Sequence, residues 1–119
     1  MSMESDLTTL LHTLCPRVFP DFAPSGTAAP YIVYQAIGGQ PLRWLDGAAA
    51  DKRHTLVQID VWASTRIAAL ALSRQVEALI SNVGAVPFMA QPENEPAWDS
   101  DEDGPLYGCQ QDFRIISTR

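Results

Sequence analysis

Residues 54–62 read HTLVQIDVW, and their side chains alternate in character along the chain. Thr55, Val57, Ile59 and Val61 fall on one face of an extended segment, and Leu56, Gln58, Asp60 and Trp62 fall on the other. Side chains point to opposite faces of a strand with a period of two, so this pattern predicts a strand. We expect the face that carries Val57, Ile59 and Val61 to lie against the core.

A second strand is predicted just upstream, at residues 31–37, which read YIVYQAI. This segment is rich in β-branched and aromatic residues, which favour strands. We expect it to pair antiparallel with residues 54–62. Gly38 and Gly39 allow a bend after it, and residues 40–53 are predicted to form a long loop.

Two segments are predicted to be helical. Residues 3–14 and residues 65–82 each carry an apolar stripe at helical spacing, with Pro16 ending the first helix and Ser64 capping the second. Between the helices, residues 16–30 are rich in proline and are expected to form a connector.

The C-terminal third is predicted to hold two further strands. Residues 85–90 are expected to form a short edge strand, because Pro87 lacks a backbone donor. Residues 91–105 form an acidic, proline-containing loop, and residues 106–118 form the last strand. The predicted fold class is α+β: one domain over 1–119, with a mostly antiparallel four-stranded sheet and two helices packed on one face.

Composition narrows the class of function. The formal net charge is -6, which disfavours binding to nucleic acid or to an anionic membrane. Neither a signal peptide nor an apolar run of membrane-spanning length is evident, and we expect no membrane partner. Cys15 and Cys109 are expected to be reduced thiols in a cytosolic compartment.

Candidate chemistry is sparse. Asp99, Asp101, Asp103 and Gly104 have the spacing of the start of a calcium loop, but Gln110 stands where such a loop needs a bidentate carboxylate. A solvated acidic loop therefore explains the motif better, and cation binding at residues 91–105 stays open.

Other polar residues give no catalytic constellation. His12 and His54 lack partners at metal-binding spacing, and Cys15 lies three residues from His12 with no third group evident. Asp60 and Asp112 could face one another across two strands, although hydrated or arginine-paired acids are the commoner case. We predict no catalytic, cofactor-binding or metal-binding residues, and no cofactor.

The tryptophans allow two interpretations. Trp44 and Trp98 stand in predicted loops, where aromatic residues often contact partner proteins. They would equally serve to cap the chain's own core. Trp62 ends a predicted core strand and is expected to be packed.

Four segments together are similar to a known family. They are Pro30–Gln35, Leu45–Gly47, Val57–Ala63 leading into an alanine-rich helix, and the C-terminal Leu106–Gly108 with Gln111–Ile115. In this order they resemble the tail completion, or tail terminator, proteins of long-tailed phages and prophages. The resemblance covers nearly the whole chain, although residues 91–105 are more acidic and proline-rich than the family leads us to expect.

The resemblance implies a structural role in the virion tail, in a protein assembled in the cytoplasm of the bacterial host. It implies a ring, commonly a hexamer, that caps the tail tube and forms the surface where the head joins. The implied partners are further copies of the chain, the major tail tube protein and the head-tail connector protein, while DNA passes through without specific binding. Long loops at 38–53 and 91–105 are the implied contacts, and the expected interface residues are Arg43, Trp44, Leu45, Asp46, Pro87 and Trp98.

A second hypothesis is a stand-alone protein-binding module. It would take a peptide through the exposed edge strand at 85–90 or through the loop around Trp44. Addition of a strand to an exposed sheet edge is a common mode of peptide recognition.

Overall fold

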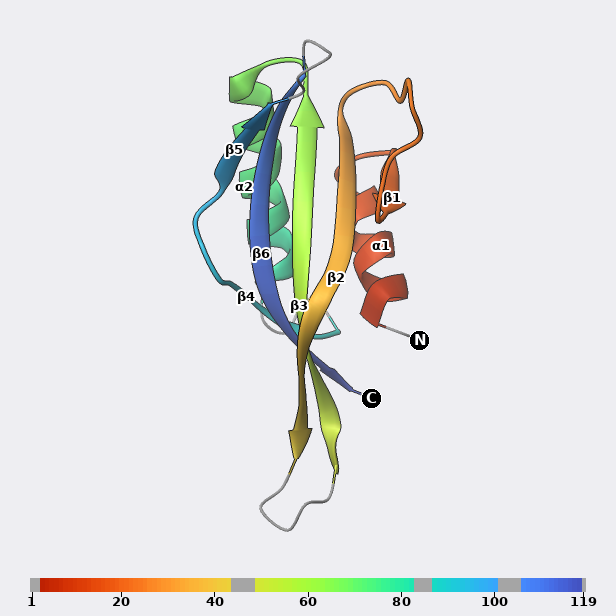
Figure 1. Ribbon diagram of the computed structural model, residues 1–119, viewed down its shortest axis with the longest axis vertical. Helices are drawn as coiled ribbons and strands as arrows, with labels where there is room; N and C mark the ends of the chain where they lie inside the picture. The colour runs from red at the N-terminus through yellow and green to blue at the C-terminus, as the bar shows by residue number, and fades with distance from the viewer. Residues whose placement is uncertain (1–2, 44–48, 83–86, 101–105, 119) are drawn as a thin grey trace.

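The computed structural model describes residues 3–43, 49–82, 87–100 and 106–118, with backbone alone for 39–43, 49–52, 99–100 and 118. These residues form two helices and six strands (Figure 1). The helices are α1 (Met3–His12) and α2 (Arg66–Ile80). The strands are β1 (Val18–Pro20), β2 (Tyr31–Arg43), β3 (Ala49–Ala63), β4 (Met89–Pro92), β5 (Ala97–Ser100) and β6 (Tyr107–Thr118).

The strands form one mixed sheet in the order β1-β2-β3-β6-β4, with β5 also paired to β6. β1 runs parallel to β2, and the other pairs are antiparallel. The α+β class is therefore confirmed and the sheet is mostly antiparallel as expected, whereas the expected number of four strands was wrong, because the described sheet has six and includes one parallel pair. Two short strands, β1 and β5, were not predicted, because they lie in segments whose prolines and acidic residues are typical of loops.

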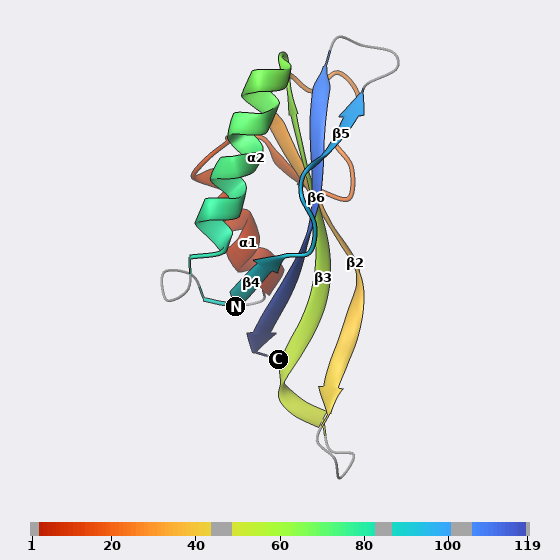
Figure 2. The same ribbon diagram turned by 90° about the vertical axis from the view of Figure 1, so that its left-hand side faces the viewer.

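Both helices cover one face of the sheet and leave the other uncovered (Figure 2). The covered face receives Val57, Ile59 and Val61 from β3, each at most 2% exposed, which confirms the face predicted from their alternation. Phe113 and Ile115 from β6 are fully buried beside them. Leu7 and Leu11 of α1 complete this layer, and burial of each such side chain contributes about 1.5–3 kcal/mol.

The long loop predicted at 40–53 is instead largely strand. β2 continues to Arg43 and β3 begins at Ala49, so the two form a long hairpin. The register shifts between Ala36 and Gly38, and Gly38 has a φ of +126°, which favours glycine. Glycine, proline and alanine all have low strand propensity, which explains why the extension was not predicted.

We call this extension, Gly38–Arg43 with Ala49–Arg53, the arm. It projects beyond the helices at one end of the molecule (Figures 1 and 2). The principal extents are 53 × 27 × 24 Å, and the radius of gyration of 15.1 Å exceeds the roughly 13.5 Å expected for a compact chain of this length. The molecule is thus elongated along the direction of the arm.

The predicted connector 16–30 supplies β1, whose pairing with β2 stops early. Asp21 donates its backbone N–H to the Tyr34 carbonyl and has a φ of +69°, so the chain turns away from the sheet there. The Arg17 side chain holds the rest of the connector, since it donates to the carbonyls of Ala28, Ala29 and Pro30. Beyond Tyr34, no strand of the described residues lies on the outer side of β2.

The ends of the predicted helices needed small corrections. α1 ends at His12 rather than residue 14, and α2 runs from Arg66 to Ile80 within the predicted 65–82. Thr65, not Ser64, caps α2: its backbone is extended and its Oγ1 accepts a hydrogen bond of 3.1 Å from the Ala68 N–H. An N-cap of this kind satisfies one of the unpaired donors at a helix start.

Replacement of the cap should separate these two candidates. We expect Thr65→Ala to lower the free energy of unfolding by about 1 kcal/mol, because the Ala68 N–H loses its acceptor. Ser64→Ala, one residue away, should change it by less than about 0.5 kcal/mol. Equilibrium urea unfolding of the two variants measures both values, and an equal loss in the two would contradict the assignment.

Candidate interaction site

Two surfaces of the sheet are candidates for contacts with other proteins, and the arm is the first. The backbone of Arg43 pairs with Ala49 at its far end. The Trp44, Leu45 and Asp46 of the predicted interface lie outside the described residues. An isolated two-stranded hairpin is marginally stable in water, so a projecting arm of this kind favours a packing partner.

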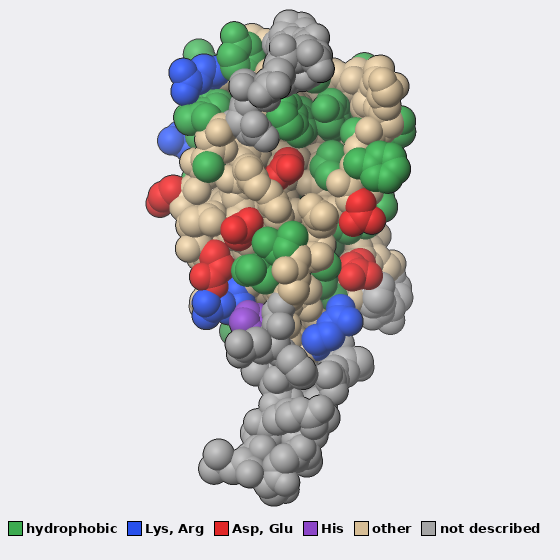
Figure 3. Space-filling view, in the orientation of Figure 1, with side chains coloured by type: hydrophobic (Ala, Val, Ile, Leu, Met, Phe, Trp, Pro, Cys, Tyr) green, Lys and Arg blue, Asp and Glu red, His purple; other side chains and the backbone are tan. Residues whose placement is uncertain are grey.

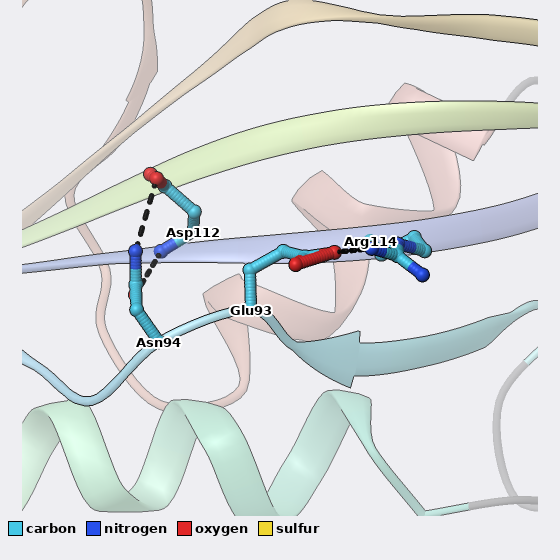
Figure 4. Close-up of polar contacts among 4 residues, drawn as sticks. All are labelled: Glu93, Asn94, Asp112 and Arg114. Carbon is cyan, nitrogen blue, oxygen red and sulfur yellow. Dashed lines mark hydrogen bonds and ion pairs between the residues drawn. The ribbon is translucent and has the colours of Figure 1, made fainter.

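The second surface is the sheet edge beside β6, where β4 and β5 pair with β6 in succession. Between them Asn94 bridges the gap: its Oδ1 accepts the Asp112 N–H at 3.0 Å, and its Nδ2 donates to the Asp112 carboxylate at 3.1 Å (Figure 4). The Glu93 N–H donates to the Asp112 carbonyl, and the Glu93 carboxylate pairs with Arg114. A side-chain amide thus replaces the missing rungs of the ladder.

The pairing of β3 with β6 shows how Asp60 and Asp112 lie relative to one another. Asp60 lies opposite Gln110, and Asp112 lies opposite Gln58, so the two aspartates are diagonal rather than directly opposed. The Asp112 carboxylate is held by Asn94, while Arg114 pairs with Glu93. The structure therefore does not bring these acids together as a general acid and base.

The edge also limits the pairing of another strand. Because the Glu93 N–H points to β6, the alternation of an antiparallel ladder points the backbone of Ala90 and Pro92 outward. Pro92 has no N–H to offer at its outward position. Pro87, predicted to lie within this strand, instead precedes β4 and is exposed. Prolines and interruptions of this kind protect sheet edges from adventitious pairing.

Aromatic residues gather near the start of α2. The ring of Trp98 lies 4.3 Å from the guanidinium of Arg66, a cation–π distance, and is 44% exposed. Tyr107 and Ile67 are also exposed, at 42% and 84%. Desolvation by burial raises the pKa of the Cys109 thiol, while the positive charge of Arg66 partly offsets this rise.

Trp62 is packed, but on the uncovered face of the sheet. Its ring stacks on Tyr31 with centroids 6.3 Å apart. A Cβ at Gly108 would lie 3.0 Å from the Trp62 ring, so glycine is needed there for the ring to lie flat on β6. Figure 3 shows apolar side chains gathered toward this end of the face, with acidic side chains scattered below them.

Two shallow clefts flank the helices. One, of about 220 Å³, lies between α2 and the segment that joins β4 to β5, and is lined by Leu70, Ser73, Arg74, Glu77, Glu95, Pro96 and Gln111. Gln111 is 2% exposed and donates to the Glu77 carboxylate and to the Asn94 carbonyl. The other cleft, of about 180 Å³, lies beside α1 and includes Glu4 and Tyr34.

Neither cleft has the features of a metal centre. Within the described ranges, no group of three or more His, Cys, Asp or Glu side chains is placed to hold a metal ion. The Cys15 thiol donates to the carbonyls of Arg17 and Pro30, an arrangement of a buried structural thiol. Residues 101–105 of the acidic motif lie outside the described part. No described helix is long and apolar enough to cross a membrane.

Comparison with known proteins identifies the family. Residues 2–118 match the family described as tail completion protein gp17. The chain belongs to this family. It is a structural protein of the phage tail, is located in the virion tail and is not an enzyme.

A solved structure shares the fold of this tail completion protein. It is a chain of the virion of a native gene transfer agent particle, with a TM-score of 0.70 and 15% sequence identity. The similarity covers 99% of this chain and 96% of that chain. No curated protein matches the sequence significantly.

The bridge at Asn94 was not predicted, because a lone asparagine between Glu93 and Glu95 is an ordinary loop residue in a sequence.

Replacement of Asn94 tests its bridging role. We expect Asn94→Ala to lower the free energy of unfolding of the tail completion protein by about 1–3 kcal/mol, because the amide makes two hydrogen bonds to Asp112. Gln91→Ala, an exposed change on β4, is the matched control and should cost less than about 0.5 kcal/mol. Urea unfolding measures both, and equal effects would contradict a bridging role.

Proposed function

We propose that copies of this tail completion protein form a ring, expected to be a hexamer, that caps the tail tube and presents the surface to which the head-tail connector binds. The match to the family over residues 2–118 carries this proposal. The partners are further copies of the chain, the major tail tube protein and the connector. We take residues 1–119 as one domain that supplies all of these contacts.

The two unlike surfaces support a closed ring. A head-to-tail contact needs two different patches on each subunit, and it closes only if the rotation between copies is right. The arm projects from one end of the sheet, whereas the interrupted β4–β5 edge runs along the side of β6 (Figure 1). We propose that Arg43, Trp44, Leu45 and Asp46 contact a neighbouring copy or the tube. Pro87 and Trp98 belong to the opposing patch.

Charge supports passage of DNA without binding. Residues 93–103 contain six acids and no lysine or arginine: Glu93, Glu95, Asp99, Asp101, Glu102 and Asp103. Asp60 and Asp112 add negative charge to the uncovered face of the sheet. A channel lined by such charge repels phosphate, so that DNA slides through it.

The stand-alone binding module receives less support. Strand addition needs a row of outward backbone donors, and the described edge at β4 offers few because Pro92 has none. The exposed Trp98 remains available for a side-chain contact, which a ring uses equally well.

Removal of the protein tests the proposed function. In a phage or prophage that lacks the gene, we expect tails of irregular, excessive length and few joined heads, because nothing ends the tube or forms the joint. Electron microscopy of lysates measures tail length and the fraction of tails with heads. Re-expression of the full chain is the control. Tails of normal length with normal heads would refute the proposal.

A further inference from the structure

The outer edge of β2 becomes free where β1 leaves the sheet. The Ile32 N–H donates to the Arg17 carbonyl at 2.9 Å. Two residues on, the Tyr34 carbonyl accepts from the Asp21 N–H at 2.8 Å. The backbone direction alternates along a strand, and the pairing with β3 stays regular through Ala36, so the backbone of Ala36 is also directed outward. No described strand pairs with Ala36 on that side.

A cleft lies beside this free backbone. Its volume is about 180 Å³, and its lining includes Ala36 together with residues of α1, β3 and the end of β1. The Thr8 Oγ1 and the Tyr34 hydroxyl share a hydrogen bond of 2.7 Å, which holds α1 against β2. Figure 1 shows α1 beside this stretch of β2, just below β1. The cleft is therefore formed before any partner binds, as is usual for binding sites.

An added strand would direct one side chain into the cleft. Ala36 pairs with Val57, which lies on the face of β3 that the helices cover. Directly paired residues project their side chains to the same face of a sheet. A residue that pairs with Ala36 from outside therefore points its side chain toward α1. The register shift after Ala36 interrupts the ladder, so this side chain has to supply most of the selectivity.

The cleft has apolar walls and an acidic rim. Leu7 and Val57 are 0% and 1% exposed and contribute apolar surface, whereas Glu4 and Asp21 are exposed. No ion pair within the described ranges involves either carboxylate. A lysine or arginine side chain matches this lining, because its aliphatic stem covers apolar surface while its charged end pairs with carboxylates.

We propose that the cleft between α1 and the free edge of β2 binds an extended segment of a different tail protein. The segment pairs with the backbone of Ala36 and places a lysine or arginine side chain between Glu4 and Asp21. The net charge of -6 favours a different protein, because a second copy presents a mostly acidic surface and a basic segment is attracted. The inference needs no ring, and it rests on the proposed function only in that the partner belongs to the tail.

A capped pentapeptide tests the site, with a central arginine flanked on each side by valine and threonine. It is titrated into the full chain and followed by nuclear magnetic resonance of the backbone amides. We expect the Ala36 resonance to shift and its hydrogen exchange to slow by at least about threefold at about 5 mM peptide, because the N–H gains an acceptor. The same peptide with a central glutamate should bind at least about tenfold more weakly, because Glu4 and Asp21 repel it.

Variants of the two carboxylates test the role of charge. Glu4→Gln and Asp21→Asn should each weaken binding of the arginine peptide by about threefold, and together by about tenfold. Asparagine tolerates the φ of +69° at position 21, so the turn is preserved. Glu95→Gln is the matched control, since it removes the same charge from the other cleft and should leave binding unchanged. Thermal melts confirm that each variant is folded.

Three outcomes would overturn the inference. They are the absence of any shift at Ala36 at about 5 mM peptide, equal binding of the arginine and glutamate peptides, and unchanged binding by the folded double variant. A shift at Ala36 that follows the concentration of the chain alone would show a second copy at this edge, which contradicts the choice of a different protein. None of these results bears on the proposed ring, because removal of the gene tests that function separately.

Discussion

The pairing of β3 with β6 is the constraint on which the rest of the molecule depends. It runs without a break from Lys52 opposite Thr118 to Ala63 opposite Tyr107. Because side chains alternate, this one register decides which side chains meet the helices and which remain on the uncovered face. A slip by one residue would bury Asp60 and Asp112 and expose Val57 and Phe113. Every other element attaches to this pair or to a strand beside it.

Part of this organisation is evident in the sequence. The alternation in 54–62 was enough to predict that strand and its buried face, and residues 106–118 were predicted as a strand without a buried face. The apolar stripe in 65–82 was enough to predict the main helix. The alternation of apolar and polar side chains is a local property of a strand, so the strand can be predicted without knowing which distant segment pairs with it. The α+β fold class was predicted from these elements.

Other parts depend on partners far along the chain and gave no local signal. β1 has three residues and forms only because β2 offers it an edge. β5 lies in an acidic segment and forms because the first part of β6, residues 107–110, pairs with it. The β2 part of the arm contains Gly38, Gly39 and Pro41, which disfavour strand, yet it pairs with β3 as far as Arg43, with register shifts after Ala36 and after Pro41. Of the predicted interface, Trp98 is exposed at an edge and Pro87 precedes a strand, while Trp44, Leu45 and Asp46 fall outside the described residues.

The described sheet edges offer few backbone donors to a further strand. Pro92 and the Asn94 bridge remove the regular row of backbone donors from one edge, and Asp21 turns the chain away from the other. In the proposed ring, contacts between copies would then use side chains, whose charge and shape select a partner and a register. Among the described residues, the exposed Trp98, Tyr107 and Ile67 near the start of α2 and the exposed Glu95 supply such side chains.

The central claim is that the arm is a contact element rather than a free hairpin, and a reconstruction of the tail end by electron cryomicroscopy tests it most directly. The account predicts a ring in which each arm packs against a neighbouring copy or against the tube. A ring whose arms extend into solvent, touching neither a neighbouring copy nor the tube, would contradict it.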